Sequence, residues 1–322
     1  MAGWLDVHAH YVTARYRDEC VTAGHAHPDG MPGIPGWNVE AALDVMGRSG
    51  IGAAVLSVSS PGVHFGGNTI SANAAARALA AHVNDVGAQL VSDRPATFGF
   101  AAALPLPDVE GALNELARAR DSLGADAVAL KTNYHGRYLS DREFAPVLDE
   151  LNAHAAVVLL HPTSPPGWEA TALGRPRPML EFLFDTTRCV IDLILSQTLT
   201  CHPSIRWIVP HAGAVLPVVA HRVAAVAAAT GSVVDVPGAL ASFYYDLAGL
   251  PLPVALDALL AVVGPDHLLY GSDFPFTPAP AVIALAQALA GAPVLDSAEL
   301  TLAPGAAGAS LFPRLSGPPL PG

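Results

Sequence analysis

Apolar residues in this chain gather in short continuous runs, and within each run they do not alternate with polar residues. Eight such runs, rich in Val, Ile, Leu and Ala, lie near residues 3–8, 51–58, 96–103, 126–131, 155–161, 205–211, 242–247 and 267–271. Strands of this kind are typical of a parallel sheet whose two faces are both covered. The pattern therefore predicts eight buried parallel strands.

Longer helical stretches separate most of these runs. They cover residues 38–48, 68–91, 108–122, 141–153, 179–200, 214–230, 251–263 and 278–290. Strand and helix alternating eight times indicate a (β/α)8 barrel, a fold of the α/β class. We expect one distorted barrel over residues 1–315, followed by a loosely held Pro/Gly-rich tail over residues 316–322.

Two predicted loops follow strands at the end where barrel enzymes bind their substrates. Residues 20–37, rich in proline and glycine, form a long loop after the first strand, and residues 59–68 follow the second. We expect both loops to reach the rim, and the first to form part of a lid. Three aromatic residues are candidates for the apolar walls of a pocket there: Phe65, Trp168 and Phe276.

The composition narrows the class of partner. Hydrophobic residues make up 52% of the 322 residues and charged residues only 14%, which provides for a large core. With 16 basic and 28 acidic residues the formal charge is -12, which argues against nucleic acid or an anionic membrane surface as partner. The longest Ala/Val stretch, residues 212–230, contains His221 and Arg222 and predicts a barrel helix, not a membrane span.

The cysteines and the N-terminus indicate in which cellular compartment the protein is expected. Cys20, Cys189 and Cys201 form no CxxC pair and cannot all pair with one another. The N-terminus has no basic segment followed by an apolar segment, so we expect no secretory signal. These features predict a reduced, cytoplasmic protein.

Metal-binding side chains stand at the ends of several apolar runs. His8 and His10 are two positions apart, which puts both imidazoles on the same face of a strand. His161 ends another run, and Asp273 follows the last one. Each residue alone has a structural alternative: a hydrogen-bonded histidine, or an N-cap for the helix near Pro278. Because a parallel barrel brings these ends to one rim, the four together predict a divalent metal site with room for water or substrate.

Two further residues lie at strand ends and leave their roles open. His211 could be another nitrogen ligand or a general acid or base beside the metal, and we favour the second role because four ligands are already assigned. Lys131 could be an ion-paired residue, a contact for an anionic substrate group, or a carboxylated lysine that bridges two metals.

Taken together, these residues resemble the amidohydrolase superfamily, and within it the nonhydrolytic decarboxylases related to aminocarboxymuconate semialdehyde decarboxylase. The resemblance runs from residues 6–10 (DVHAH) to residues 270–275 (YGSDFP) and includes residues 211–214 (HAGA). Residues 132–139 (TNYHGRYL) and 184–188 (FDTTR) are most similar to 6-methylsalicylate decarboxylases. The chain departs from the family where a second glycine is replaced by Ala214, and where Gly-Asn-Ala is replaced by residues 305–307 or lost.

The resemblance implies a role for each matching residue. His8, His10, His161 and Asp273 would be ligands of one divalent ion, and His211 the catalytic histidine. Arg222 would reach the site of a neighbouring subunit and contact the substrate carboxylate, which implies a homodimer. Some relatives carry a glutamate at the first histidine and prefer manganese, so the histidine pair here favours zinc, with manganese as the alternative.

The expected reaction is the nonoxidative decarboxylation of a small hydroxyaromatic or muconate-type acid, such as 6-methylsalicylate. Protonating the ring carbon first avoids an unstabilised aryl carbanion, with Asp273 as the first candidate for the donor and His211 as the second. Arg188, Arg222 and Lys131 are candidates for binding the substrate anion, although Arg188 could equally form a structural ion pair. The alternatives are a metal-dependent hydrolase of a lactone, amide or related ester, and a noncatalytic binding barrel.

Overall fold

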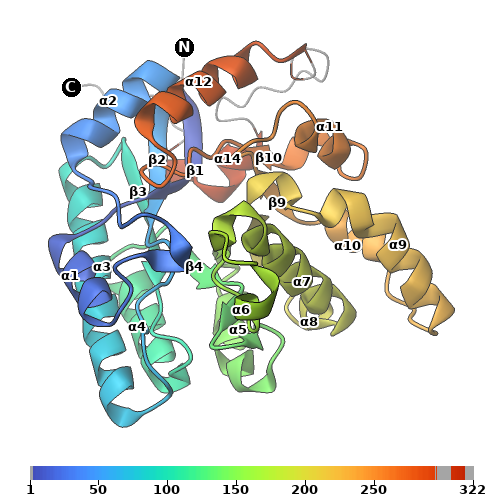
Figure 1. Cartoon of the computed structure of the whole chain (residues 1–322), viewed down its shortest axis with the longest axis horizontal. Helices are drawn as coiled ribbons and strands as arrows, with labels where there is room; N and C mark the ends of the chain where they lie inside the picture. The colour runs from blue at the N-terminus through green and yellow to red at the C-terminus, as the bar shows by residue number, and fades with distance from the viewer. Residues whose placement is uncertain (1–2, 294, 296–305, 316–322) are drawn as a thin grey trace.

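The computed structural model describes residues 3–293, 295 and 306–315 (Figure 1). Eight parallel strands form one sheet in the order β1-β2-β3-β4-β7-β8-β9-β10. The strands are β1 (Trp4–His10), β2 (Ile51–Ser57), β3 (Phe98–Ala103), β4 (Ala127–Lys131), β7 (Val157–His161), β8 (Arg206–Val209), β9 (Tyr244–Asp246) and β10 (Leu268–Leu269). A parallel bridge between Asp6 and Tyr270 joins the first strand to the last. The predicted (β/α)8 barrel is therefore confirmed.

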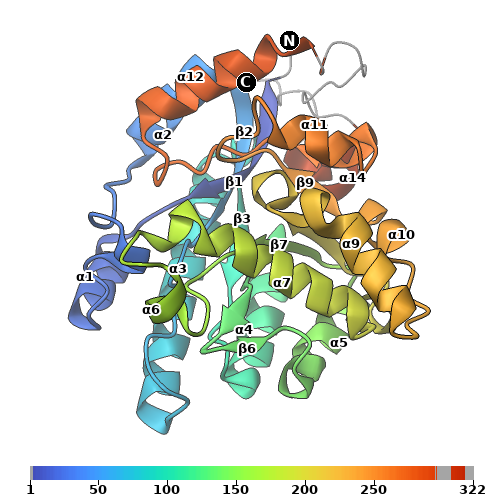
Figure 2. The ribbon, with the colours of Figure 1, turned by 45° about the vertical axis from the view of Figure 1, so that its right-hand side comes forward.

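Helices surround the sheet, as Figures 1 and 2 show. Those that match the eight predicted stretches are α2 (Val39–Ser49), α3 (Ile70–Asp93), α4 (Val109–Asp121), α5 (Ala145–Ala153), α7 (Glu181–Leu195), α9 (Leu216–Ala229), α11 (Ala255–Leu260) and α12 (Ala279–Ala290). Local chemistry sets their ends: the Asn38 side chain accepts a hydrogen bond from the backbone N–H of Ala41, and Gly50 ends α2 at φ 72°. None of the helices in the described part of the chain is long and apolar enough to cross a membrane.

Several short elements were not predicted. They are α1 (Ala14–Thr22), α6 (Trp168–Thr171), α10 (Val236–Ala241), α14 (Ala306–Leu311), the hairpin β5 (Asn133–Tyr134) with β6 (Arg137–Tyr138), and the 3-10 turns η1 (Pro28–Gly30), η3 (Arg177–Met179), η4 (His211–Gly213), η5 (Pro265–His267) and η6 (Pro313–Leu315). The helix predicted over residues 179–200 is interrupted at Gln197, which has φ 63°, so α8 (Thr198–Cys201) is a separate helix. The stretch predicted over residues 141–153 begins with the 3-10 turn η2 (Arg142–Phe144). In α1 only Tyr16 and Cys20 are buried, so its apolar stripe is too narrow to read from the pattern. The segment 20–37 is therefore partly helical. Residues 316–322 and Gly305 lie outside the described residues.

A register shift in β1 decides which way its histidines point. Val7 belongs to the inner apolar cluster, which takes alternate residues of the strands, whereas Ala9 belongs to the outer cluster that packs under the helices. Strict alternation would put both on one face, but the pairing with β2 shifts between Asp6 and Ala9. A shift of this kind re-aims the following side chains. It leaves His8 and His10 on the inner side of the barrel, as the site requires.

Candidate metal centre

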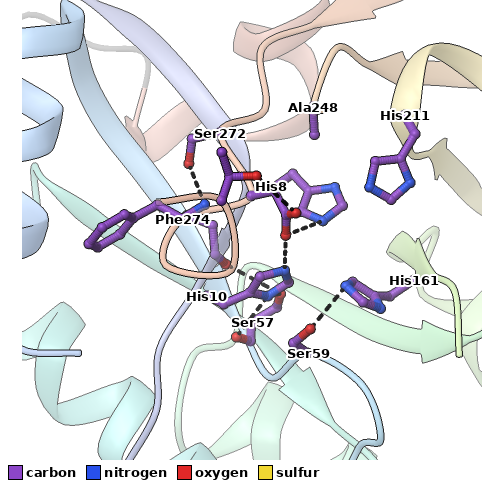
Figure 3. A network of polar contacts seen from close by, with 12 residues as sticks. His8, His10, Ser57, Ser59, His161, His211, Ala248, Ser272 and Phe274 are labelled. Carbon is purple, nitrogen blue, oxygen red and sulfur yellow. Dashed lines mark hydrogen bonds and ion pairs between the residues drawn. The ribbon is translucent and has the colours of Figure 1, made fainter. Parts of the chain in front are cut away.

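The four predicted ligands lie together at the carboxyl ends of the strands. β1 supplies His8 and His10, β7 ends at His161, and Asp273 follows β10. One donor atom from each of the four lies within 4.8 Å of the donor atoms of the other three. Oδ1 of Asp273 is 3.2 Å from Nε2 of His10 and 3.7 Å from Nε2 of His8. Figure 3 shows the rings of the three histidines turned towards a common centre.

Hydrogen bonds on the outer ring nitrogens leave the inner ones to bind an ion. Nδ1 of His8 lies 2.8 Å from Oδ2 of Asp246, and Nδ1 of His10 lies 3.0 Å from Oγ of Ser57. Nδ1 of His161 donates to the carbonyl oxygen of Pro162 at 2.7 Å. When Nδ1 is bonded outward, Nε2 presents its lone pair inward, which is the usual arrangement of metal-bound histidine.

Two of these inner nitrogens are buried without a hydrogen bond. Nε2 of His8 and Nε2 of His10 have none within the described part of the chain, and Nε2 of His161 has only the hydroxyl of Ser59 at 3.3 Å. A buried polar atom left in this state costs about 1–3 kcal/mol. Three imidazoles and a carboxylate are the donors that zinc or manganese takes. The site therefore fits a divalent metal ion.

The protonation states suit metal binding. Burial lowers the pKa of His10 to about 4 and holds the pKa of His161 well below its usual range, so both rings are neutral near pH 7. Burial alone would also lower the pKa of His8, but the neighbouring Asp246 carboxylate raises it to about 9. An ion that binds at His8 therefore displaces a proton.

His211 lies beside the ligands and is not one of the four residues grouped as a metal site. It begins η4, with one residue between it and the end of β8, at φ 58°, and the following Ala212 has φ 52°. Such left-handed conformations in non-glycine residues cost about 1–3 kcal/mol and occur at functional sites. The backbone N–H of His211 donates to Oδ1 of Asp246 at 3.1 Å, and its ring centroid is 5.1 Å from that of His8. His211 therefore lies next to the four-residue metal group without belonging to it.

A cavity of about 630 Å³ opens above these residues. His161, His211 and Asp273 line one end, and Ser59 and Ser60 bring the loop after β2 to it. The remaining walls are mainly apolar side chains, including Met31, Met179, Phe182, Leu183, Phe276 and Leu285.

Of the three predicted aromatic walls, only Phe276 lines this cavity. Phe65 instead packs against Tyr16 and His25, and Trp168 stacks under Arg177, so the predicted roles of Phe65 and Trp168 as walls are wrong. Phe65 lies on the predicted loop 59–68 and contacts the segment after β1, whereas Trp168 begins α6 and contacts η3.

The three predicted anion-binding cations do not line the cavity in the described part of the chain. Nζ of Lys131 is buried and donates to the carbonyl oxygen of Val58 at 2.7 Å, and burial lowers its pKa to about 7. Arg188 pairs with Asp185 at 3.2 Å, which is the arrangement of a structural ion pair. Arg222 is exposed on α9. No hydrogen bond or ion pair involves Arg222 among the described residues.

Asp185, in the segment 184–188, connects the β5–β6 hairpin to α7. Asp185 is fully buried in α7 and accepts hydrogen bonds from Asn133 at 2.9 Å, from the hydroxyl of Tyr138 at 2.6 Å, and from Thr132. These three residues belong to the segment that forms the β5–β6 hairpin after β4. The carboxylate therefore holds the hairpin on the helix whose first turns line the cavity through Phe182 and Leu183.

Comparison with known proteins agrees with this site. A family model described as amidohydrolase matches residues 5–303. The chain belongs to the amidohydrolase family. The family resemblance inferred from the motifs is thus confirmed.

Individual amidohydrolase relatives match along most of the chain. A 6-methylsalicylic acid decarboxylase from Penicillium expansum is 32% identical over 321 residues, 97% of each chain. Decarboxylase macB from Penicillium terrestre is 35% identical over 294 residues, 85% of this chain and 84% of that protein. A crystal structure described as amidohydrolase II superimposes with a TM-score of 0.89 at 33% identity, covering 96% of this chain and 99% of that one.

Sequence reasoning missed a residue that orders this amidohydrolase site. Asp246 ends β9 and is buried, with Oδ2 on His8 and Oδ1 on the backbone N–H groups of His211 and Ala248. Burial by itself would raise the pKa of Asp246, but its contacts with His8 and His211 hold it below its usual range. A carboxylate at a strand end was the signal that identified Asp273, and the same rule applied to residues 242–247 would have found Asp246.

We predict that Asp246→Asn weakens metal binding about 10- to 100-fold, the usual effect of losing an outer partner of a metal-bound histidine. The neutral amide no longer stabilises the ring of His8 with Nε2 facing the ion. Titration against a competing chelator measures the loss, with the exposed Asp257→Asn on α11 as the matched control. Equal affinity in the two variants would contradict the role of Asp246.

Proposed function

We propose that this amidohydrolase is a metal-dependent, nonoxidative decarboxylase of a small hydroxyaromatic acid such as 6-methylsalicylate. The likeness to a 6-methylsalicylic acid decarboxylase along nearly the whole of both chains carries the proposal. The donor set of His8, His10, His161 and Asp273, beside a largely apolar cavity, supports it. A flat aromatic ring suits such walls, and its carboxylate suits the polar end.

The site residues have two proposed functions in the reaction, binding the metal ion and delivering a proton. A divalent ion held by the four ligands would supply a Lewis acid for the carboxylate and ortho-hydroxyl oxygens of the substrate. The protein must then deliver a proton to the ring carbon that carries the carboxylate, so that the electrons of the breaking C–C bond return to the ring. Positioning the donor next to that carbon is the main catalytic task of the side chains.

Asp273 and His211 are the two candidates for the proton donor. Burial alone would raise the pKa of Asp273, but the nearby His10 and His8 hold it below its usual range, so Asp273 must first receive a proton. Its Oδ2 accepts a hydrogen bond from Thr277 at 3.2 Å. His211 lines the cavity and has a buried Nδ1 without a hydrogen bond in the described chain. We keep Asp273 as the first candidate and His211 as the second.

The experiment that tests this function uses a panel of ortho-hydroxybenzoates that includes 6-methylsalicylate. Metal-loaded protein should release carbon dioxide and the matching phenol from at least one of them. A panel without turnover, together with hydrolysis of a lactone or ester substrate, would overturn the proposal. A hydrolase with two metal ions would need Lys131 to bridge them. The amine of Lys131 instead donates a hydrogen bond to the carbonyl oxygen of Val58, so we do not propose that activity.

We further propose that the resident ion is zinc, because three imidazoles and one carboxylate match its preferred ligands. Metal analysis of protein purified without added metal tests this, and manganese is the alternative result. The three free cysteines support a cytoplasmic location, because unpaired thiols suit a reducing compartment.

We also propose a homodimer in which Arg222 serves the neighbouring site. Arg222→Ala should lower kcat/KM about 10- to 100-fold, the usual worth of a hydrogen bond to a charged group. Mixing it with His211→Asn should restore activity, because one site of each heterodimer then holds both intact residues. An active monomer in light scattering, or no recovery on mixing, would contradict the role of Arg222.

A further inference from the structure

A second carboxylate, besides that of Asp273, belongs to a residue that lines the cavity. Asp29 belongs to η1, in the loop after β1, and is only 8% exposed. Its Oδ1 accepts a hydrogen bond from the hydroxyl of Ser164 at 2.5 Å. The hydrogen bond to Oδ1 is the one found for this carboxylate among the described residues, and Asp29 is one of the residues that line the cavity. Its Oδ2 is therefore available to accept a hydrogen bond from a bound molecule.

Neighbouring residues hold Asp29 in this position. Nε of Arg177 donates to the hydroxyl of Ser164 at 3.1 Å, so Ser164 links the guanidinium to the carboxylate. The guanidinium also lies 4.0 Å from the ring centre of Trp168. A side chain at residue 30 would come within 2.5 Å of Nη1 of Arg177, so Gly30 allows η1 and η3 to meet.

The backbone of Asp29 is itself in an unusual conformation. Its φ is 54°, a left-handed conformation that aspartate adopts more readily than most residues but still at a cost. The Arg177–Ser164 arrangement sustains that conformation. The carboxylate is therefore a fixed part of the cavity wall, with its orientation set before any ligand arrives.

The charge and size of the cavity define what would bind there. Asp29 and Asp273 are the two residues with carboxylate side chains among the described residues that line it, and Arg177 and Lys131 lie near Asp29. A carboxylate in the wall attracts a hydrogen-bond donor of the bound molecule. The cavity of about 630 Å³ is several times the roughly 150 Å³ that accommodates benzene. It has space for a ring with further substituents.

We propose that Asp29 is a specificity-determining residue that accepts a hydrogen bond from a second ring hydroxyl of the substrate. The inference rests on the proposed decarboxylase function and narrows its substrate class to dihydroxylated benzoic acids. In such a substrate the ortho-hydroxyl and carboxylate lie at the metal end, and the second hydroxyl meets Oδ2 of Asp29. Chemistry at the carboxylate is the same with or without that hydroxyl.

The test compares two enzymes on matched substrates. The substrates are 6-methylsalicylate and its derivatives with one added hydroxyl at each free ring position. Wild type should have a kcat/KM about 10- to 100-fold higher for one of these isomers than for 6-methylsalicylate, the worth of a hydrogen bond to a carboxylate. Asp29→Asn should lose that advantage, mainly through KM, and keep its kcat/KM for 6-methylsalicylate within about threefold.

Ser164→Ala is the companion variant, because it keeps the carboxylate but removes the hydrogen bond to Oδ1 that holds it in place. It should reduce the preference for the hydroxylated isomer only in part, and less than Asp29→Asn does. If Asp29→Asn lowers activity on both kinds of substrate equally, or if wild type prefers none of the hydroxylated isomers, Asp29 does not select the substrate. If the protein decarboxylates 6-methylsalicylate in that experiment, the proposed decarboxylase function holds even when the role of Asp29 fails. If it turns over none of the tested acids, both proposals are refuted.

Discussion

Replacing His211 with asparagine is expected to lower kcat about 10²- to 10⁴-fold, the usual contribution of general acid–base catalysis, without loss of the metal ion. The residue lines the cavity next to His161 and Asp273 but lies outside the four-ligand group. Asparagine keeps a polar side chain of similar reach and cannot exchange a proton near neutral pH. The measurement is steady-state turnover of the best acid in the panel, together with metal analysis of the same sample.

Two comparisons make the His211 result interpretable. The exposed His154→Asn changes the same pair of residue types far from the cavity, beside Glu150, and should keep wild-type turnover. Thermal unfolding should show that His211→Asn remains folded. Full turnover by His211→Asn would refute the acid–base role, and loss of the ion would make His211 a ligand.

Removing the divalent ion is expected to reduce decarboxylation to the background rate, and zinc or manganese should restore it. His10→Ala should weaken metal binding by more than about 100-fold, because even an outer partner of a ligand is worth about 10- to 100-fold. His10 is almost fully buried, so solvent cannot easily substitute for the lost ring at the same place. Chelator titration with parallel activity and metal assays measures both effects.

Asp273→Asn separates the two tasks assigned to Asp273. If this residue only holds the ion, excess metal should recover much of the activity of the variant. If it also delivers the proton, the metal-saturated variant should remain about 10²- to 10⁴-fold slower. Full turnover in chelated, metal-free protein would contradict the metal-dependent reaction as a whole.

The ligands could be predicted from the sequence because the carboxyl ends of all strands of a parallel barrel lie at the same rim. Continuous apolar runs predict parallel strands, and a polar residue at the carboxyl end of such a strand lies at the rim of the barrel. That reasoning placed His161, Asp273 and His211 correctly around one centre. It also put His8 and His10 on one face, although the register shift that turns this face inward could not be read from the residues.

The parts that escaped prediction depend on contacts between distant loops. The position of Asp29 is set by Ser164 and Arg177, which lie more than a hundred residues further along the chain. Lys131 stands at a strand end like the ligands, yet its long side chain reaches the carbonyl of Val58. Residue type and spacing contain no signal for such partners, because tertiary packing decides them.

The barrel closes next to its metal-binding residues, at a seam where β1 meets the segment after β10. The backbone N–H of Asp273 donates to the carbonyl of His8 at 2.7 Å, and that of His10 to the carbonyl of Phe274 at 2.7 Å. Three of the four ligands thus lie at this junction, His8 and His10 on β1 and Asp273 after β10, while His161 comes from β7. A ribosome-bound chain still lacking the segment after β10 has an incomplete donor set, so tight binding of the ion requires that residue 273 has been made. A bound ion would link residues on both sides of the seam and stabilise the folded state, so the unfolding temperature should rise with metal concentration.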